Sequence, residues 1–310
     1  MTRTITTVTP EELRAEVGSG LLCFPVTHAN PDLSLDEAGF RQHLEYLAQH
    51  RPAGVFVAGG TGEFFALRLA EVKALVSAGV GAVQNVPVIA PAGYGTATAV
   101  EMAREGTEAG ADGVFLLPPY LTEVDQEGLK AHVRAVCRST PLGVIVYHRA
   151  NARFEPRTVI ELADELPNLV GFKDGVGDLD TLTTLQATLG PRLVYIGGLP
   201  TAETYALPYL EVGVTTYSSA IFNFAPQWAQ MFYDAVVNRR RDQVTEQIRD
   251  FVLPYIEIRN RRAGYAVSIV KAGLRAVGRP AGPVRPPLVD LTSHEVELLA
   301  SLVAPLGCIQ

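Results

Sequence analysis

Short, continuous apolar runs recur along the chain, and each ends in Gly, Pro or polar residues before a stretch compatible with a helix. Continuous rather than alternating apolar character is typical of parallel strands covered on both faces. The runs follow one another at intervals of about 20 to 35 residues, which suits βα units. They are Leu21–Val26, Gly54–Val57, Val86–Ala90, Gly113–Leu117, Gly143–Tyr147, Leu169–Lys173, Leu193–Gly197 and Val212–Tyr217. Eight units within roughly 220 residues predict an α/β fold, a closed (β/α)8 TIM barrel.

The stretches between the runs carry helix start and stop signals. Ser34 precedes Glu37 by three residues, a capping-box spacing. A helix over Thr98–Ala109 is expected to end at Gly110, and Pro156 stands near the start of another.

The chain continues beyond the eighth run with further helical patterns. These cover Pro226–Arg239, Asp242–Arg259, Ala266–Val277 and His294–Leu302, with a proline-rich connector at Arg279–Pro287. Because no flexible linker or low-complexity tract separates them from the barrel, we expect two packed parts. Residues 1–224 would form the catalytic barrel with a short N-terminal extension, and residues 225–310 a C-terminal helical appendage.

Composition narrows the range of partners. The formal net charge of −7 argues against nucleic acid and anionic membranes, which attract basic surfaces. The polar N-terminus shows no signal peptide, and no apolar run approaches the ~20 residues of a membrane span. Three cysteines, Cys23, Cys137 and Cys308, lie far apart without a CxxC pair. Together these features predict reduced thiols and a cytoplasmic protein.

Two strand ends carry candidate catalytic side chains. Lys173 ends the sixth run, where burial disfavours the ammonium form and yields a neutral amine that attacks ketones. The alternative is a structural lysine paired with Asp174. Tyr147 ends the fifth run, so the two would be neighbours at the barrel mouth, where the tyrosine is placed to move protons. By itself, a tyrosine at this position is more often an ordinary packed side chain than a catalytic one.

A glycine-rich turn follows the second run. In Gly59-Gly60-Thr61-Gly62-Glu63, backbone N–H groups and the Thr61 hydroxyl can approach a carboxylate closely. The turn lacks the Gly-Lys-Ser/Thr ending of a P-loop, and Gly93-Tyr-Gly95 lacks the third glycine of a dinucleotide fingerprint. The six histidines are scattered without metal-ligand spacing. We therefore predict no nucleotide site and no metal site.

The Gly60–Glu63 turn, Tyr147 and Gly171-Phe-Lys173, in this order and spacing, resemble the dihydrodipicolinate synthase/N-acetylneuraminate lyase family over nearly the whole chain. Within it the likeness is to a subfamily of decarboxylating dehydratases. The similar stretches are 62–65, 146–151, 171–178, 197–203, 216–223 and 264–273. Three positions depart from the wider family: Gly60 stands in place of a hydroxyl residue, Leu121 in place of a second tyrosine, and Ala152 in place of an arginine. The departures argue against a synthase with a tyrosine relay between subunits.

The resemblance implies a small-molecule substrate, a keto-deoxy sugar diacid, and a lyase reaction through a covalent imine on Lys173 without any cofactor. Tyr147 would be the general acid and base. Two carboxylates call for two anion sites, so we expect Gly60 and Thr61 near the imine and Arg149 at the distal carboxylate. Asn151, Ser218 and Ser219 are further candidates for substrate contacts, and Gly197 and Gly198 would line the mouth. Alternatives remain open: Arg149 as a surface residue, the serines as turn residues, and the glycines as relief of crowding.

Two other functions share these residues. A class I aldolase would use Lys173 and Tyr147 to cleave a 2-keto-3-deoxy sugar acid to pyruvate. A non-catalytic regulator would bind a sugar acid without needing a nucleophilic amine. The resemblance also implies a homo-oligomer, a tetramer or dimer of dimers, and no nucleic-acid or membrane partner.

Overall fold

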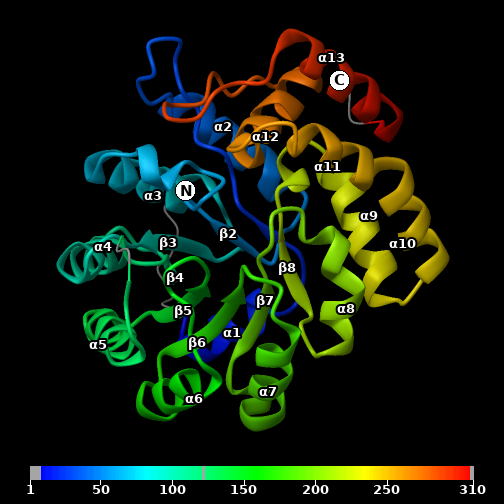
Figure 1. Cartoon of the computed structure of the whole chain (residues 1–310). Coiled ribbons are helices and arrows are strands. Elements are labelled where there is room, and N and C mark those ends of the chain that lie inside the picture. The colour runs from blue at the N-terminus through cyan, green and yellow to red at the C-terminus, as the bar shows by residue number, and fades with distance from the viewer. Residues whose placement is uncertain (1–7, 121–122, 308–310) are drawn as a thin grey trace.

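The computed structural model describes residues 8–120 and 123–307 and shows a closed barrel of eight parallel strands in sequence order (Figure 1). The strands are β1 (Leu22–Cys23), β2 (Gly54–Phe56), β3 (Val88–Ala92), β4 (Gly113–Leu116), β5 (Gly143–His148), β6 (Leu169–Asp174), β7 (Val194–Gly197) and β8 (Thr216–Ser219). The predicted fold class is therefore confirmed. The prediction for β8 began too early, because Val212 ends the preceding helix rather than starting the strand.

A ring of helices surrounds the strands (Figure 1). It consists of α2 (Glu37–Ala48), α3 (Leu69–Ala82), α4 (Thr96–Glu108), α5 (Gln126–Cys137), α6 (Pro156–Glu165), α7 (Leu179–Leu189), α8 (Ala206–Glu211) and α9 (Pro226–Val237). Helix α9 follows β8, packs on α8, and its Gln230 side chain donates to the His50 carbonyl just beyond α2 at 2.9 Å. Because α9 closes the ring, we propose that the barrel unit extends to Val237 instead of residue 224.

The start of α2 differs from the sequence prediction. Asp36, not Ser34, caps the helix, and its carboxylate accepts the Gly39 N–H at 2.9 Å. The Ser34 hydroxyl instead donates to Asp32 at 2.6 Å within the preceding turn. A carboxylate one residue before the helix outcompetes a hydroxyl three residues away because only the adjacent residue reaches the free N–H groups.

A helix not predicted from the sequence, α1 (Pro10–Val17), covers the N-terminal end of the barrel. Leu13 is fully buried, and Cβ atoms at Gly113 or Gly143, the first residues of β4 and β5, would collide with it. The capping box between Thr9 and Glu12 was a readable signal for this helix. With this end closed, the opposite, C-terminal end is left for a site.

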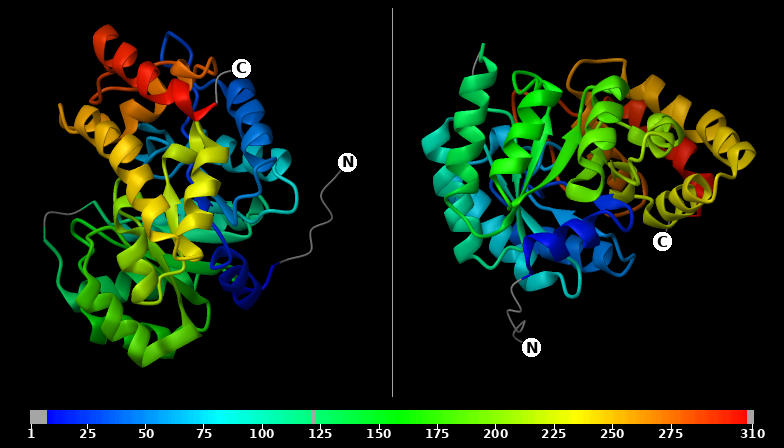
Figure 2. Two further views of the ribbon diagram at one scale, coloured as in Figure 1. Left: turned by 90° about the vertical axis from the view of Figure 1, so that its right-hand side faces the viewer. Right: turned by 90° about the horizontal axis from the view of Figure 1, so that it is seen from below.

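The C-terminal helices form a layer on one side of the barrel (Figure 2). They are α10 (Arg241–Gln247), a π-helical turn (Ile248–Val252), α11 (Leu253–Arg259), α12 (Tyr265–Ala276) and α13 (Ser293–Val303). The predicted helices of this region are present, and their apolar side chains join the same core as the barrel. Within residues 8–120 and 123–307, no helix is long and apolar enough to cross a bilayer.

Candidate active site

Lys173 and Tyr147 lie side by side at the C-terminal ends of β6 and β5. They are register partners in the parallel ladder, so their side chains leave the sheet on the same face. Lys173 is 3% exposed and Tyr147 is 7% exposed. The structure thus brings together the two side chains that sequence reasoning proposed for catalysis.

Aromatic rings surround the Lys173 amine. Its Nζ lies 4.0 Å from the ring centre of Tyr147, 4.9 Å from that of Phe24 and 5.6 Å from that of Phe115. Burial lowers the pKa of Lys173 below its usual value, although the neighbouring Tyr147 hydroxyl opposes the shift. A lower pKa raises the fraction of neutral amine, the form that attacks a carbonyl carbon.

The alternative role of Lys173 as the ion-pair partner of Asp174 does not match the contacts. The fully buried Asp174 carboxylate accepts from the N–H groups of Val176 and Gly177 and from the Tyr209 hydroxyl at 2.8 Å. Within the described part of the chain, no ion pair joins Lys173 to a carboxylate. Asp174 therefore holds the loop after β6, and the amine stays available.

The Tyr147 hydroxyl is held from two sides. It donates to the Gly198 carbonyl at 3.0 Å and accepts from Arg149 Nη1 at 2.9 Å. Burial raises the pKa of Tyr147, but the positive charges of Lys173 and Arg149 outweigh burial, so the net pKa lies below the usual value. A tyrosine that ionises more easily, in contact with the amine, is suited to accept and return protons.

Glycines are needed beside both catalytic candidates. A Cβ atom on Gly198 would lie 2.6 Å from Lys173 Nζ, and a Cβ atom on Gly175 would lie 2.6 Å from the Tyr147 ring. The backbone can therefore approach both functional groups only because these positions lack side chains.

A cavity of about 600 Å³ opens at this end of the barrel. The predicted site residues that line it are Lys173, Tyr147, Gly60, Thr61, Arg149, Asn151, Gly198 and Ser218. Its other described walls are mainly apolar and aromatic. The cations in the described lining are Lys173, Arg149 and Arg259, and that lining contains no carboxylate. Such a cavity favours an anionic ligand.

Two predicted site residues lie outside the cavity lining. The Ser219 side chain points away and donates to the buried Glu203 carboxylate at 2.6 Å. A Cβ atom on Gly197 would meet Tyr209 at 2.6 Å and Tyr217 at 2.9 Å, so this glycine relieves crowding. Neighbouring residues on a strand face opposite sides of the sheet. This alternation could have shown from the sequence alone that only one of Ser218 and Ser219 faces the cavity.

The glycine-rich turn after β2 forms part of the cavity wall at Gly60 and Thr61. In the described residues, the N–H groups of Gly60 and Thr61 donate to no protein acceptor. A Cβ atom on Gly60 would meet nothing within 4 Å. The turn therefore offers unoccupied donors and open space for a carboxylate.

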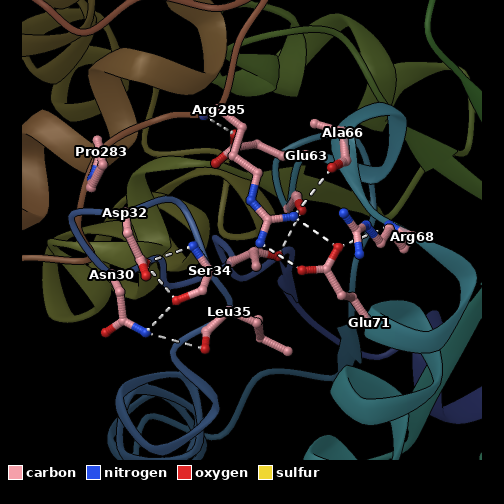
Figure 3. A network of polar contacts seen from close by, with 12 residues as sticks. Asn30, Asp32, Ser34, Leu35, Glu63, Ala66, Arg68, Glu71, Pro283 and Arg285 are labelled. Carbon is pink, nitrogen blue, oxygen red and sulfur yellow. Dashed lines mark hydrogen bonds and ion pairs between the residues drawn. The ribbon is translucent and has the colours of Figure 1, made fainter.

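The turn is anchored by an ion pair that sequence reasoning missed. Glu63, in the left-handed region with φ 60°, and Lys271 of α12 are each 1% exposed and meet at 2.6 Å. Glu63 also accepts a hydrogen bond from the backbone N–H of Arg285 at 2.7 Å. The Arg285 guanidinium in turn donates to the Glu71 carboxylate and the Ala66 carbonyl (Figure 3). The C-terminal segment thus fixes the turn that lines the cavity.

In the sequence, Arg259, Arg261 and Arg262 form a cluster of charges that is more typical of a solvated face or an inter-subunit contact than of a substrate site. For Arg259 the structure contradicts a position on a solvated face. Arg259 lines the cavity, while Arg261 and Arg262 are exposed. Nothing local distinguishes the three residues, because only the packing of α11 against the loop after β7 turns Arg259 inward.

Of the three departures noted in the sequence, Leu121 lies outside the described residues. Ala152 is buried and forms a bridge with Arg149, which closes the loop after β5. Cys23 and Cys137 are buried free thiols, and Cys308 is also outside the described part. No cluster of metal ligands occurs among the residues that the structure describes.

Comparison with known proteins shows which family the chain matches. The Dihydrodipicolinate synthetase family profile matches residues 18–305. Two curated relatives are each named "Probable 5-dehydro-4-deoxyglucarate dehydratase". The one from Saccharopolyspora erythraea is 63% identical, covering 95% of this chain and 96% of its own. The one from Methylobacterium radiotolerans is 61% identical, covering 96% and 98%.

Solved structures show the same fold. Dihydrodipicolinate synthase from Oceanobacillus iheyensis superposes with a TM-score of 0.87 at 24% identity, covering 96% of this chain and 99% of that chain. The enzyme from Bacillus clausii gives 0.86 at 26% identity, covering 94% and 99%.

Proposed function

Since the chain belongs to the dihydrodipicolinate synthetase family, we propose that it is a Schiff-base lyase that dehydrates and decarboxylates 5-dehydro-4-deoxyglucarate to 2,5-dioxopentanoate. The observation that carries the proposal is that the buried Lys173 amine contacts the Tyr147 ring inside the cavity. The described lining of this cavity includes three cations and no carboxylate. The names of the relatives at 63% and 61% identity supply the substrate.

The reaction begins with imine formation. The Lys173 amine adds to the substrate ketone, and loss of water from the carbinolamine gives a protonated imine. This imine accepts the electron pair of an adjacent C–H bond when a base removes the proton, which forms an enamine. Tyr147 is the base in our proposal, since its hydroxyl lies beside the amine and its pKa is lowered by two cations.

Dehydration and decarboxylation follow from the same electron sink. The enamine expels the hydroxyl on the next carbon as water, which leaves an imine conjugated to a C=C bond. The distal carboxylate leaves as CO2, and its bonding pair enters the conjugated imine. Two protonations on carbon, conversion of the enol to an aldehyde and hydrolysis then release 2,5-dioxopentanoate and the free lysine. Overall one substrate yields one product, one CO2 and one water.

The cavity residues divide the remaining tasks. Gly60 and Thr61 bind the carboxylate next to the imine through free N–H groups and a hydroxyl. Asn151 and Ser218 line the cavity and contact the substrate hydroxyls. The proposed chemistry uses the imine on Lys173 and calls for no metal or organic cofactor.

The test is to incubate the purified protein with 5-dehydro-4-deoxyglucarate and follow CO2 and pyruvate in the same sample. We expect stoichiometric CO2 without pyruvate, and loss of CO2 release in Lys173→Ala. Borohydride added during turnover should attach the substrate skeleton to Lys173, detected by mass spectrometry. Pyruvate without CO2 would instead assign an aldolase, and binding without either product would assign a regulator.

Two broader expectations accompany this function. We propose that the enzyme works in the cytoplasm as a homo-oligomer, a tetramer or dimer of dimers. Light scattering of the purified protein would measure the assembly directly, and a monomer at micromolar concentration would contradict it.

A further inference from the structure

The distal end of the substrate needs a cation, and the cavity offers two arginines. Arg149 Nη1 donates to the Tyr147 hydroxyl at 2.9 Å, and its guanidinium carbon lies 5.8 Å from the centre of that ring. One of the five N–H donors of Arg149 is therefore used at the catalytic tyrosine, so this arginine lies at the reacting end of the cavity. In this position Arg149 is better suited to the reacting end than to the distal carboxylate, the role predicted for it from the sequence.

Arg259 enters the cavity from a different part of the fold. It is the last residue of α11, outside the strands, and it is half-buried. Its Nη1 donates to the Pro200 carbonyl at 2.9 Å and to Thr201 Oγ1 at 2.5 Å, in the loop after β7. These bonds fix the guanidinium at the cavity wall through contacts that involve neither Tyr147 nor Arg149.

We infer that Arg259 binds the distal carboxylate and makes the site selective for keto diacids over keto monoacids, an inference that rests on the proposed function. The described lining contains no carboxylate that would neutralise Arg259. A terminal carboxylate is therefore attracted to it, while a terminal methyl or hydroxymethyl group gains nothing from the charge.

The hydrogen bonds of Arg259 also suit a carboxylate that must later depart. Of the five N–H donors of an arginine, the two on Nη1 are taken by Pro200 and Thr201. Nε and one donor of Nη2 go to Asn260 Oδ1, each at 3.1 Å. One N–H remains, so Arg259 attracts the carboxylate without a bidentate clamp. A clamp would stabilise the anion and oppose its conversion to neutral CO2.

The test uses two six-carbon keto acids that lack the substrate hydroxyls. 2-Oxoadipate has the carbon skeleton and both carboxylates of the proposed substrate, and 2-oxohexanoate lacks only the distal carboxylate. Half-saturating concentrations come from borohydride trapping on Lys173. We expect the wild-type protein to favour 2-oxoadipate by roughly ten- to a hundredfold, the size of one hydrogen bond to a charged group.

Arg259→Gln should bring this ratio close to one while leaving the value for 2-oxohexanoate unchanged. Arg259→Lys should restore part of the preference. Arg261→Gln, an exposed charge removed from the same segment, is the matched control and should keep the full ratio. If Arg259 only tethered α11 to the loop after β7, Arg259→Gln would weaken both ligands equally.

A second readout keeps the inference separate from the chemistry. Calorimetric titration of both keto acids into Lys173→Ala, which forms no imine, should show the same preference and the same loss on adding Arg259→Gln. Absence of CO2 from the sugar diacid would overturn the proposed function but leave this comparison valid. A preference that is absent from the wild type, survives Arg259→Gln, or disappears in Arg149→Gln would overturn the role of Arg259.

Discussion

Replacing Lys271 by methionine removes the charge that compensates the buried Glu63 carboxylate. Both side chains are 1% exposed, and their charged atoms lie 2.6 Å apart. In Lys271→Met the carboxylate would keep the Arg285 N–H at 2.7 Å but lose its cation, and the Pro283 carbonyl would lose its donor. Methionine has a similar length, so little cavity forms.

The size of the effect follows from the burial. Removing one partner of a buried ion pair costs about 3 to 5 kcal/mol, because the remaining charge is left uncompensated. An unfolding entropy near 2.1 cal/mol/K per residue gives roughly 0.65 kcal/mol/K for a chain of this length. The expected loss in melting temperature is therefore about 5 to 8 °C.

Thermal and urea unfolding at neutral pH measure the change. The control is the double variant Glu63→Gln with Lys271→Met, in which a neutral amide replaces the carboxylate and still accepts the Arg285 N–H. It should be more stable than Lys271→Met alone, because no unpaired charge remains. A single variant within about 1 kcal/mol of the wild type, or a double variant less stable than the single one, would refute the assignment of a compensating charge.

Three further outcomes are expected. Arg149→Gln removes the positive charge that lies beside the Tyr147 hydroxyl, so the pKa of Tyr147 should rise. The pH–rate profile for CO2 release should then shift to higher pH, and an unchanged profile would contradict this role of Arg149. Burial raises the pKa of Glu203 to about 7 from a usual value of 4.5. The contribution of Glu203 to stability is then complete below pH 4.5 and lost as the pH rises through 7. Between pH 5 and pH 8, the melting temperature of Glu203→Gln should therefore rise relative to that of the wild type. Parallel curves of melting temperature against pH for the two proteins would refute this. Gly198→Ala places a methyl group 2.6 Å from the Lys173 amine and 2.7 Å from the Asp174 carbonyl oxygen. It should reduce imine trapping at least tenfold and lower the melting temperature as well; wild-type trapping would show that the backbone can move away.

The sequence determined the barrel and its catalytic pair because both depend on local pattern. Buried parallel strands need continuous apolar runs, and the ends of adjacent strands meet at one mouth wherever the runs fall. The sequence alone could therefore place Lys173 and Tyr147 beside each other, as the strand register shows them. Element ends were less determined, since the N-cap of α2 at Asp36 depends on which oxygen reaches the free N–H groups.

Only the tertiary structure decided which charges line the cavity and which support its walls. Glu63 and Lys271 lie far apart in the chain, and no periodicity pairs them until α12 packs against the strand-two turn. Arg259 resembles its exposed neighbours in sequence, and the packing of α11 alone brings it to the cavity. Long-range contacts of this kind depend on how whole elements meet, whereas a strand's apolar run is fixed by its own residues.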